Sequence, residues 1–243
     1  MEKEVFGIKD GVLIRYYENE KDDGNNDGMK KIGDLSKLLY KEGGLLVPKD
    51  VSKIGGLSNP FYKCGSLTSV VIPKGVTEIS GEAFKGCKNL TSVTGDRLCR
   101  TCTLHSEGCA DVMPASIPGS VKYVGYEAFA GCTSLKSVKL SEGTRYIGRG
   151  AFAGCTSLTD VSIPASVTEL GTGTFAGCTS LTDVSIPASV TELGTGTFAG
   201  CTSLKEIRYG GTKAQWASVQ RGVFWCTPSV ESILCTDGKS VDV

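Results

Sequence analysis

Histidine is almost absent from this chain of 243 residues, which contains a single copy, His105. A Ser–His or Cys–His catalytic pair would therefore have to use that one residue. Net charge is absent too, because 26 lysine and arginine residues balance 26 aspartate and glutamate residues. Proteins that bind the phosphate backbone of nucleic acids generally need a basic surface, so the composition argues against nucleic acid as a partner.

Long hydrophobic runs are also missing, and no apolar segment approaches the roughly 18 residues that a membrane-spanning helix requires. The first six residues, MEKEVF, lack the basic and apolar regions of a secretory signal peptide. No glycine-rich phosphate loop is present either, since the pair Gly171 and Gly173 recurs without a lysine after it. These absences predict a protein that is not an enzyme, needs no cofactor and does not insert into a membrane.

The most prominent feature that the chain does contain is an internal repeat. Residues 155–177 read CTSLTDVSIPASVTELGTGTFAG, and residues 178–200 repeat this unit letter for letter. Related units occupy residues 132–154, residues 64–86 and the two ends of residues 87–131, with a partial copy before them and a divergent copy after them. One such unit cannot bury its own apolar side, whereas stacked units share a continuous core. The sequence therefore predicts a right-handed solenoid of about seven rungs.

The apolar residues of each unit keep one register. In residues 155–177, Val161 and Ile163 alternate as they do along a strand, and Pro164 ends that strand because proline cannot donate to a ladder. A second inward pair follows, formed by Val167 and Leu170. Gly171 then permits a sharp turn. We therefore expect one parallel sheet built from short strands.

Phenylalanine and cysteine each favour one repeat position. Six of the eight phenylalanines share a position near the end of the unit: Phe61, Phe84, Phe129, Phe152, Phe175 and Phe198. Six of the eleven cysteines share its first position: Cys64, Cys87, Cys132, Cys155, Cys178 and Cys201. Each rung needs a large apolar filler, so we expect a buried phenylalanine spine rather than a binding platform. Free cysteine behaves as a small hydrophobic residue, so we expect buried, reduced thiols, with disulfides or a metal as the alternatives.

The unit C-x-S-L-x-x-V-x-I-P-x-x-V-x-x-I/L-G-x-x-A/T-F-x-G resembles the BspA-type leucine-rich repeats of bacterial and protozoan surface proteins. The resemblance covers residues 46–209 and implies a leucine-rich-repeat solenoid. It also implies an N-terminal cap hairpin with a polar insert in residues 1–45, and a C-terminal cap in residues 210–243. Residues 94–116 depart from the pattern as an inserted, cysteine-rich loop. The implied role is adhesion or protein binding at a cell surface, although the missing signal peptide leaves the compartment open.

Two columns of residues flank the inward valines and should point outward, because side chains alternate along a strand. The first column holds Ser69, Ser92, Ser137, Asp160, Asp183 and Glu206, and the second holds Val71, Thr94, Lys139, Ser162, Ser185 and Arg208. We predict that a partner binds the stretch formed by Ser137, Lys139, Asp160, Ser162, Asp183, Ser185, Glu206 and Arg208. The alternative is a surface that is merely solvated. Three successive acidic side chains would repel one another, and a basic partner would relieve that repulsion.

The inserted loop holds four potential zinc ligands: Cys99, Cys102, His105 and Cys109. The C-x2-C start lets two thiolates bind one ion from a tight turn, and four ligands leave no open position, so such an ion would be structural. Free thiols, or a disulfide from Cys99 or Cys102 to Cys109, are the alternatives. Residues 23–34 also echo a calcium-binding loop, but they follow a strand rather than a helix, so we expect a solvated segment there.

Together these features predict a non-enzymatic repeat protein that binds another protein, in an adhesin-like or scaffolding role, and that is a monomer. One alternative is a structural spacer that displays its loops. Another is a zinc-clipped interaction module centred on residues 94–116. The identical units in residues 155–200 favour the binder and the spacer, since duplication lengthens a scaffold without adding a new site.

Overall fold

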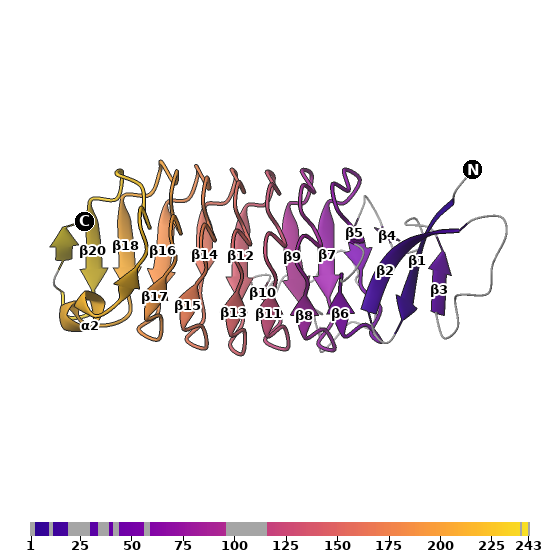
Figure 1. Ribbon diagram of the computed structural model, residues 1–243, viewed down its shortest axis with the longest axis horizontal. Coiled ribbons are helices and arrows are strands. Elements are labelled where there is room, and N and C mark those ends of the chain that lie inside the picture. The colour runs from indigo at the N-terminus through magenta and orange to yellow at the C-terminus, as the bar shows by residue number, and fades with distance from the viewer. Residues whose placement is uncertain are drawn as a thin grey trace, which may run out of the picture.

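The repeats fold into a solenoid whose rungs contribute short strands to two parallel stacks (Figure 1). The computed structural model describes residues 3–9, 12–18, 30–33, 39–40, 44–55, 59–95, 116–238 and 240–242. The rungs follow one another along the long axis, with the N-terminal strands at one end and the C-terminal strands at the other. The sequence predicts one parallel sheet, and the second stack corrects that expectation.

One stack belongs to a ten-stranded sheet. Its strands are, in spatial order, β19 (Gln220–Arg221), β17 (Glu192–Leu193), β15 (Glu169–Leu170), β13 (Tyr146–Ile147), β11 (Tyr123–Val124), β8 (Glu78–Ile79), β6 (Lys53–Ile54), β2 (Val12–Glu18), β1 (Lys3–Lys9) and β3 (Lys30–Gly33). Within this sheet, the strands from β6 through β8, β11, β13, β15 and β17 to β19 pair in parallel, each with the strand of the next rung. Strand β1 pairs antiparallel with β2 and β3, and β2 pairs in parallel with β6. The N-terminal hairpin therefore continues the sheet of the solenoid and covers its edge.

The other stack is divided between two sheets. The seven-stranded sheet has the order β10 (Ser116–Ile117), β12 (Ser137–Leu140), β14 (Asp160–Ser162), β16 (Asp183–Ile186), β18 (Glu206–Tyr209), β20 (Ser232–Cys235) and β21 (Ser240–Asp242). The four-stranded sheet has the order β4 (Leu39–Tyr40), β5 (Gly44–Leu46), β7 (Ser69–Ile72) and β9 (Ser92–Gly95). The division falls between β9 and β10, which are the strands directly before and after the insertion in the chain.

A proline corner separates the two strands of a rung. Strand β14 ends before Pro164, because proline has no N–H to donate to a ladder. The carbonyl of Pro164 accepts a hydrogen bond from the N–H of Val167 at 3.1 Å, which closes the corner. Val167 and Leu170 then point into the core and are at most 1% exposed. The second strand, β15, is two residues long, so it is too short to show the alternation by which strands are recognised in a sequence.

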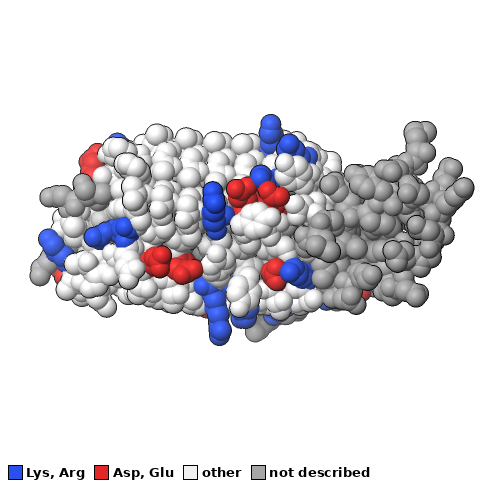
Figure 2. Space-filling view, viewed as in Figure 1, with Lys and Arg blue, Asp and Glu red and all other residues white. Residues whose placement is uncertain are grey.

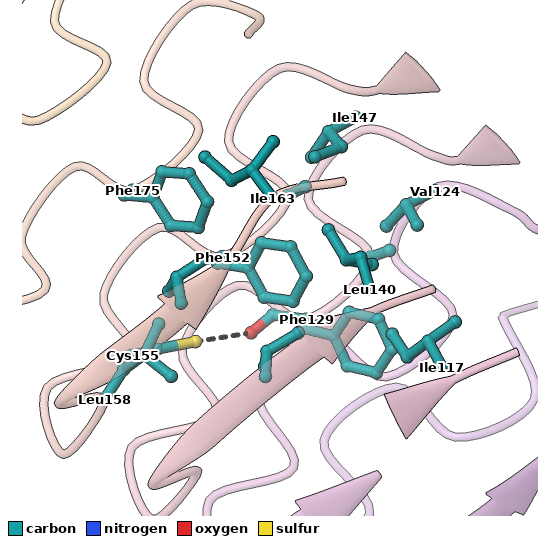
Figure 3. Close-up of a cluster of buried hydrophobic side chains, with 14 of the residues drawn as sticks. Ile117, Val124, Phe129, Leu140, Ile147, Phe152, Cys155, Leu158, Ile163 and Phe175 are labelled. Atoms are coloured by element: carbon teal, nitrogen blue, oxygen red, sulfur yellow. Dashed lines mark hydrogen bonds between the residues drawn. The ribbon is translucent and has the colours of Figure 1, made fainter. Parts of the chain in front are cut away.

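Six phenylalanine rings form a continuous stack through the core, three of which appear in Figure 3. All six rings are 0% exposed: Phe61, Phe84, Phe129, Phe152, Phe175 and Phe198. Successive ring centroids lie 5.3 to 5.5 Å apart, and the ring planes lie within 10° of parallel. The ring of Trp225 meets the last phenylalanine edge-on at 6.5 Å and ends the stack. The predicted buried spine is confirmed, and these rings are not a binding platform.

The repeat cysteines form a second buried row beside this spine. Five of them are 0% exposed free thiols, as predicted: Cys87, Cys132, Cys155, Cys178 and Cys201. Each of these thiols donates a hydrogen bond to the carbonyl of a phenylalanine on a neighbouring rung, as Cys155 does to Phe129 at 3.2 Å (Figure 3). The Phe129 carbonyl also accepts the backbone N–H of Cys132 at 3.1 Å. Cys64, at the start of the row, is partly exposed.

Gly171 begins a turn, as predicted, because its carbonyl accepts the N–H of Thr174 at 3.3 Å, and it also allows close packing of neighbouring rungs. A Cβ at Gly171 would lie 2.9 Å from the backbone nitrogen of Arg149 on the preceding rung. Gly194 is the equivalent residue one rung later, and a Cβ there would lie 2.5 Å from the backbone nitrogen of Thr172. The left-handed conformation that favours glycine falls two residues further on, at Gly173, where φ is +62°.

A short helix and a pair of strands close the C-terminal end. Helix α2 (Lys213–Ala217) begins at Thr212, whose side chain accepts the N–H of Gln215 while the Gln215 side chain accepts the N–H of Thr212. The helix places Trp216 against Tyr209 and Trp225, at centroid distances of 5.0 and 5.6 Å. Strand β21 pairs antiparallel with β20 beyond the last rung. The described part of the chain contains no helix whose length and hydrophobicity would let it cross a membrane.

We expect the substitution Phe175→Ala to lower the free energy of unfolding by about 3–5 kcal/mol, because it removes a buried ring from the middle of the stack. Ser162→Ala, at an exposed position of β14, should change that free energy by less than about 0.5 kcal/mol. Urea unfolding of both variants and the parent chain measures the difference. Comparable losses in the two variants would contradict the assignment of inward and outward positions.

The buried thiols should make stability depend on pH above the ordinary pKa of cysteine. Burial raises the pKa of Cys87 and of Cys155 to about 12, because a thiolate in the core would lose its hydration. The unfolded chain releases these protons from about pH 8.5 upward, whereas the folded chain retains them. The stabilisation is therefore complete below that pH and is lost as the pH rises through the raised pKa, by about 1.4 kcal/mol per thiol and pH unit.

The matched variant for this pH dependence is Cys155→Ser, because a serine hydroxyl does not titrate in this range and can donate to the same Phe129 carbonyl. Urea-unfolding series at about pH 8, 9 and 10 should show a shallower loss of stability for the variant than for the parent chain. Identical slopes would show that Cys155 ionises as readily in the folded chain as in the unfolded one.

Candidate interaction surface

The outward residues of β12, β14, β16 and β18 form two straight columns on one face of the seven-stranded sheet. The parallel register places Ser137, Asp160, Asp183 and Glu206 in one column, and Lys139, Ser162, Ser185 and Arg208 in the other. The valine or isoleucine between the columns on each strand points inward and is at most 2% exposed. Lys139 and Asp160 are partly buried, and the other six residues of the two columns are exposed. The structure thus brings all eight predicted residues together, and we call this surface the two-column face.

An ion pair crosses the two-column face between neighbouring rungs. Arg208 Nη2 lies 2.7 Å from Asp183 Oδ1, and Arg208 Nε donates to Ser185 Oγ at 3.4 Å. Both charged side chains are 54% exposed, so solvent screens the pair and it stabilises the fold by about 1 kcal/mol or less. Asp160 and Glu206 form no ion pair with another residue that the structure describes. Within the described residues, the middle carboxylate of the acidic column is therefore compensated and the outer two are not.

Both columns extend beyond this face toward the ends of the solenoid. On β7 and β9, Ser69 lies beside Ser92, and Val71 lies beside Thr94. Val71 is 7% exposed, so the expectation that it points into solvent is wrong, and strands β5 and β9 flank it on both sides. At the other end, Leu234 of β20 continues the second column and is 37% exposed.

The profile of the BspA type leucine rich repeat region matches residues 48–103 and 106–231 of the chain, in six copies. This chain belongs to the BspA-type leucine-rich-repeat family. The matched residues cover the stacked rungs that carry the phenylalanine spine and the two-column face. Both the family and the solenoid fold that the sequence predicts are therefore confirmed.

The chain is similar to solved leucine-rich-repeat proteins, and one of them shares its fold. A leucine-rich-repeat protein of T. pallidum is 24% identical, with a TM-score of 0.62 over 90% of this chain and 83% of that one. A leucine-rich-repeat protein from Bacteroides ovatus is 23% identical, with a TM-score of 0.43 over 97% of this chain and 70% of that one. A leucine rich cell surface protein from Faecalibacterium prausnitzii is 26% identical, with a TM-score of 0.38 over 71% of this chain and 55% of that one. No curated protein sequence matches this chain significantly.

The insertion interrupts one BspA-type rung between strands β9 and β10. Strand β9 ends at Gly95 and β10 begins at Ser116, and Ile117 fills the inward position of that rung at 0% exposure. The rings of Phe84 and Phe129, which lie before and after the insertion in the chain, are stacked at the usual 5.3 Å. The described residues on both sides of the insertion therefore keep the packing of the core.

The predicted metal ligands fall outside the described residues: Cys99, Cys102, His105 and Cys109. Residues 23–29 of the calcium-like segment lie outside them as well, and residues 30–33 form strand β3. Within the part of the chain that the structure describes, no three His, Cys, Asp or Glu side chains are grouped so as to hold a metal ion. The zinc-clipped loop thus remains a prediction from the sequence.

The BspA-type rungs also present a further column of outer residues, exposed or partly exposed, that the sequence did not predict. It runs along the ten-stranded sheet through Lys53, Glu78, Tyr123, Tyr146, Glu169, Glu192 and Gln220. The view in Figure 2 shows charged side chains in small mixed groups with uncharged surface between them. In the sequence, each residue of this column directly precedes the inward apolar residue of the short second strand. It is the middle letter of the triplets TEL, KYV and RYI.

A cluster of three charged side chains joins two turns, and its charges pair with one another. Lys85 Nζ lies 2.6 Å from Glu82 Oε1 and 2.6 Å from Glu127 Oε2, and Asn59 donates to Glu82 Oε2 at 3.0 Å. The hydrogen bonds to Glu127 and Glu82 raise the pKa of Lys85. Both glutamates have positive φ, +56° and +49°, at the position where the next rung carries Gly150. We therefore interpret the group as a structural clamp that holds two unfavourable turns.

Proposed function

We propose that this BspA-type repeat protein is a non-enzymatic binding protein that recognises another protein through the exposed faces of its strands. The observation that carries the proposal is the contrast between inward and outward positions. The inward positions are apolar in nearly every rung, whereas the outward positions of the same strands vary among serine, lysine, arginine and acidic residues. Residues 155–177 and 178–200 are identical, so stacking itself does not require this variation.

The site that we propose is the two-column face. Its side chains recur once per rung in each column, so an extended segment laid across the strands would meet a polar group at every step. Asp160 and Glu206 carry charges without a partner among the described residues, whereas Asp183 forms an ion pair with Arg208. A basic surface would pair with the two outer carboxylates and compete with Arg208 for the middle one. Its association should be fast and should weaken as salt is added.

Membership of the family supports an adhesin-like or scaffolding role, because stacked repeats build long surfaces that suit protein contacts. The cell surface is the location that this resemblance implies, and we keep it as part of the proposal. We propose neither a cofactor nor a nucleic-acid partner, in line with the zero net charge. We also keep the monomer as the expected state.

The double substitution Asp160→Ser with Asp183→Ser should weaken partner binding and leave folding intact. Serine stands at the same column position in Ser137, so the change copies a residue that the stack already accepts. Surface plasmon resonance at two salt concentrations, against the partner recovered by proteome-wide capture, measures the loss. Arg208→Ser is the matched opposite, because it frees Asp183 and should strengthen binding of a basic partner. Unchanged affinity in the double variant, without salt dependence, would exclude the two-column face.

A further inference from the structure

Tyrosine and basic residues gather on two neighbouring rungs of the ten-stranded sheet. The positions before, on and after strands β11 and β13 hold Lys122, Tyr123, Tyr126, Arg145, Tyr146 and Arg149, which we call the tyrosine–arginine patch. Tyr123 pairs in register with Tyr146. The N–H of Glu127 donates to the carbonyl of Arg149 at 2.8 Å, which places the turns of Tyr126 and Arg149 side by side. The three tyrosines are 51%, 58% and 39% exposed in chain order.

Three neighbouring rungs show which residues packing accepts at these three positions. They carry Thr77, Glu78 and Gly81 before the patch, and Thr168, Glu169 and Thr172, then Thr191, Glu192 and Thr195, after it. The inward neighbours within the patch, Val124 and Ile147, stay apolar and 0% exposed. Two rungs thus keep the common core but replace all six outer residues with tyrosine, lysine or arginine. Stacking does not need this change, so we infer that the patch contacts something outside the solenoid.

Contacts within the protein hold Tyr126 and Lys122 of the patch in place, and leave its two arginines available. The ring of Tyr126 lies directly over Gly81, because a Cβ on that glycine would overlap the ring. Lys122 Nζ is anchored on the carbonyl of Gly119 at 2.7 Å. Arg145 and Arg149 form no side-chain hydrogen bond or ion pair with any residue in the described ranges. A ring already fixed on the surface loses little conformational entropy on binding, and no described residue uses the donors of the two guanidinium groups.

The chemistry of the patch selects the kind of partner. Tyrosine and arginine are the residue types enriched where protein interfaces gain most of their affinity. The six residues carry three positive charges and no carboxylate, which favours an acidic segment. Glu78 borders the patch on one side and Glu169 on the other. A long polyanion that followed the stack would meet these carboxylates, whereas a short acidic segment fits between them.

We propose that the tyrosine–arginine patch is a second interaction surface that binds a short acidic, aromatic-containing segment of another protein. The acidic residues of the segment pair with Arg145 and Arg149, and its aromatic residues pack on the exposed tyrosines. The patch lies on a different sheet from the two-column face and takes a partner of opposite charge. The inference therefore does not depend on the function proposed for the two-column face.

The test uses the full chain and an immobilised random copolymer of glutamate and tyrosine, with a copolymer of lysine and tyrosine as the charge-reversed control. The variant is Arg145→Thr with Tyr146→Glu and Arg149→Thr, which gives this rung the outer residues of the rung at Thr168, Glu169 and Thr172. Because the stack already accepts those residues, urea unfolding should show a folded variant. We expect the parent chain to prefer the glutamate copolymer, and the variant to bind it at least about tenfold more weakly.

The double variant Asp160→Ser with Asp183→Ser separates this surface from the two-column face, because it should retain the affinity of the parent chain for the glutamate copolymer. Arg149→Thr alone serves if the triple variant is less stable, and it should weaken binding by about threefold. Equal binding by the parent chain and the patch variants, or a preference for the lysine copolymer, would overturn the proposal. Binding of a labelled single-stranded oligonucleotide that is lost in the triple variant would also overturn it, because the patch would then take nucleic acid.

Discussion

The spacing between rungs is fixed at the carbonyl of the repeat phenylalanine, and the rest of the structure depends on that spacing. The Phe129 carbonyl accepts one backbone N–H, from Cys132, and one thiol, from Cys155. The N–H of Phe129 donates to the carbonyl of Ala151, in the following unit, at 2.8 Å. A buried carbonyl with these donors leaves little freedom to slide, because each lost hydrogen bond would leave a polar group unsatisfied in an apolar core. The phenylalanine rings then stack at the spacing that these bonds impose.

This fixed spacing explains which changes a rung tolerates. One rung carries an insertion between Gly95 and Ser116, and the rings of Phe84 and Phe129, before and after it, remain 5.3 Å apart. A side chain added at Gly171 would instead meet the backbone of the rung before it. Thr144 shows a third case, because it replaces an inward valine and is 0% exposed. Its hydroxyl donates to the carbonyl of Val121 at 2.9 Å, so a polar residue is accepted where the adjacent rung supplies the acceptor.

The features predicted correctly from the sequence are those that repeat within one unit. Phe175 and Cys178 recur at fixed positions, so their burial follows from the register alone. The second stack was missed because a strand of two residues has no alternation to detect. The pair of Arg208 with Asp183 was missed for a different reason. This ion pair forms between side chains on two neighbouring strands, β18 and β16. The sequence of a single repeat unit does not show which side chains of the next unit will lie within reach.

Comparison of the repeat units separates the positions that packing fixes from the positions that can vary. The charged residues at the variable positions differ in whether another residue of the protein compensates their charge. Where an outer charge is compensated within the protein, as Asp183 is by Arg208, it contributes to holding neighbouring rungs together. Arg145 and Arg149 have no such partner among the described residues, so they do little for stacking, yet they replace the threonines of the identical rungs. A partner that supplies carboxylates would gain from these two charges without first breaking an internal pair. Outer charges that no described residue compensates therefore mark the surfaces from which binding free energy can come.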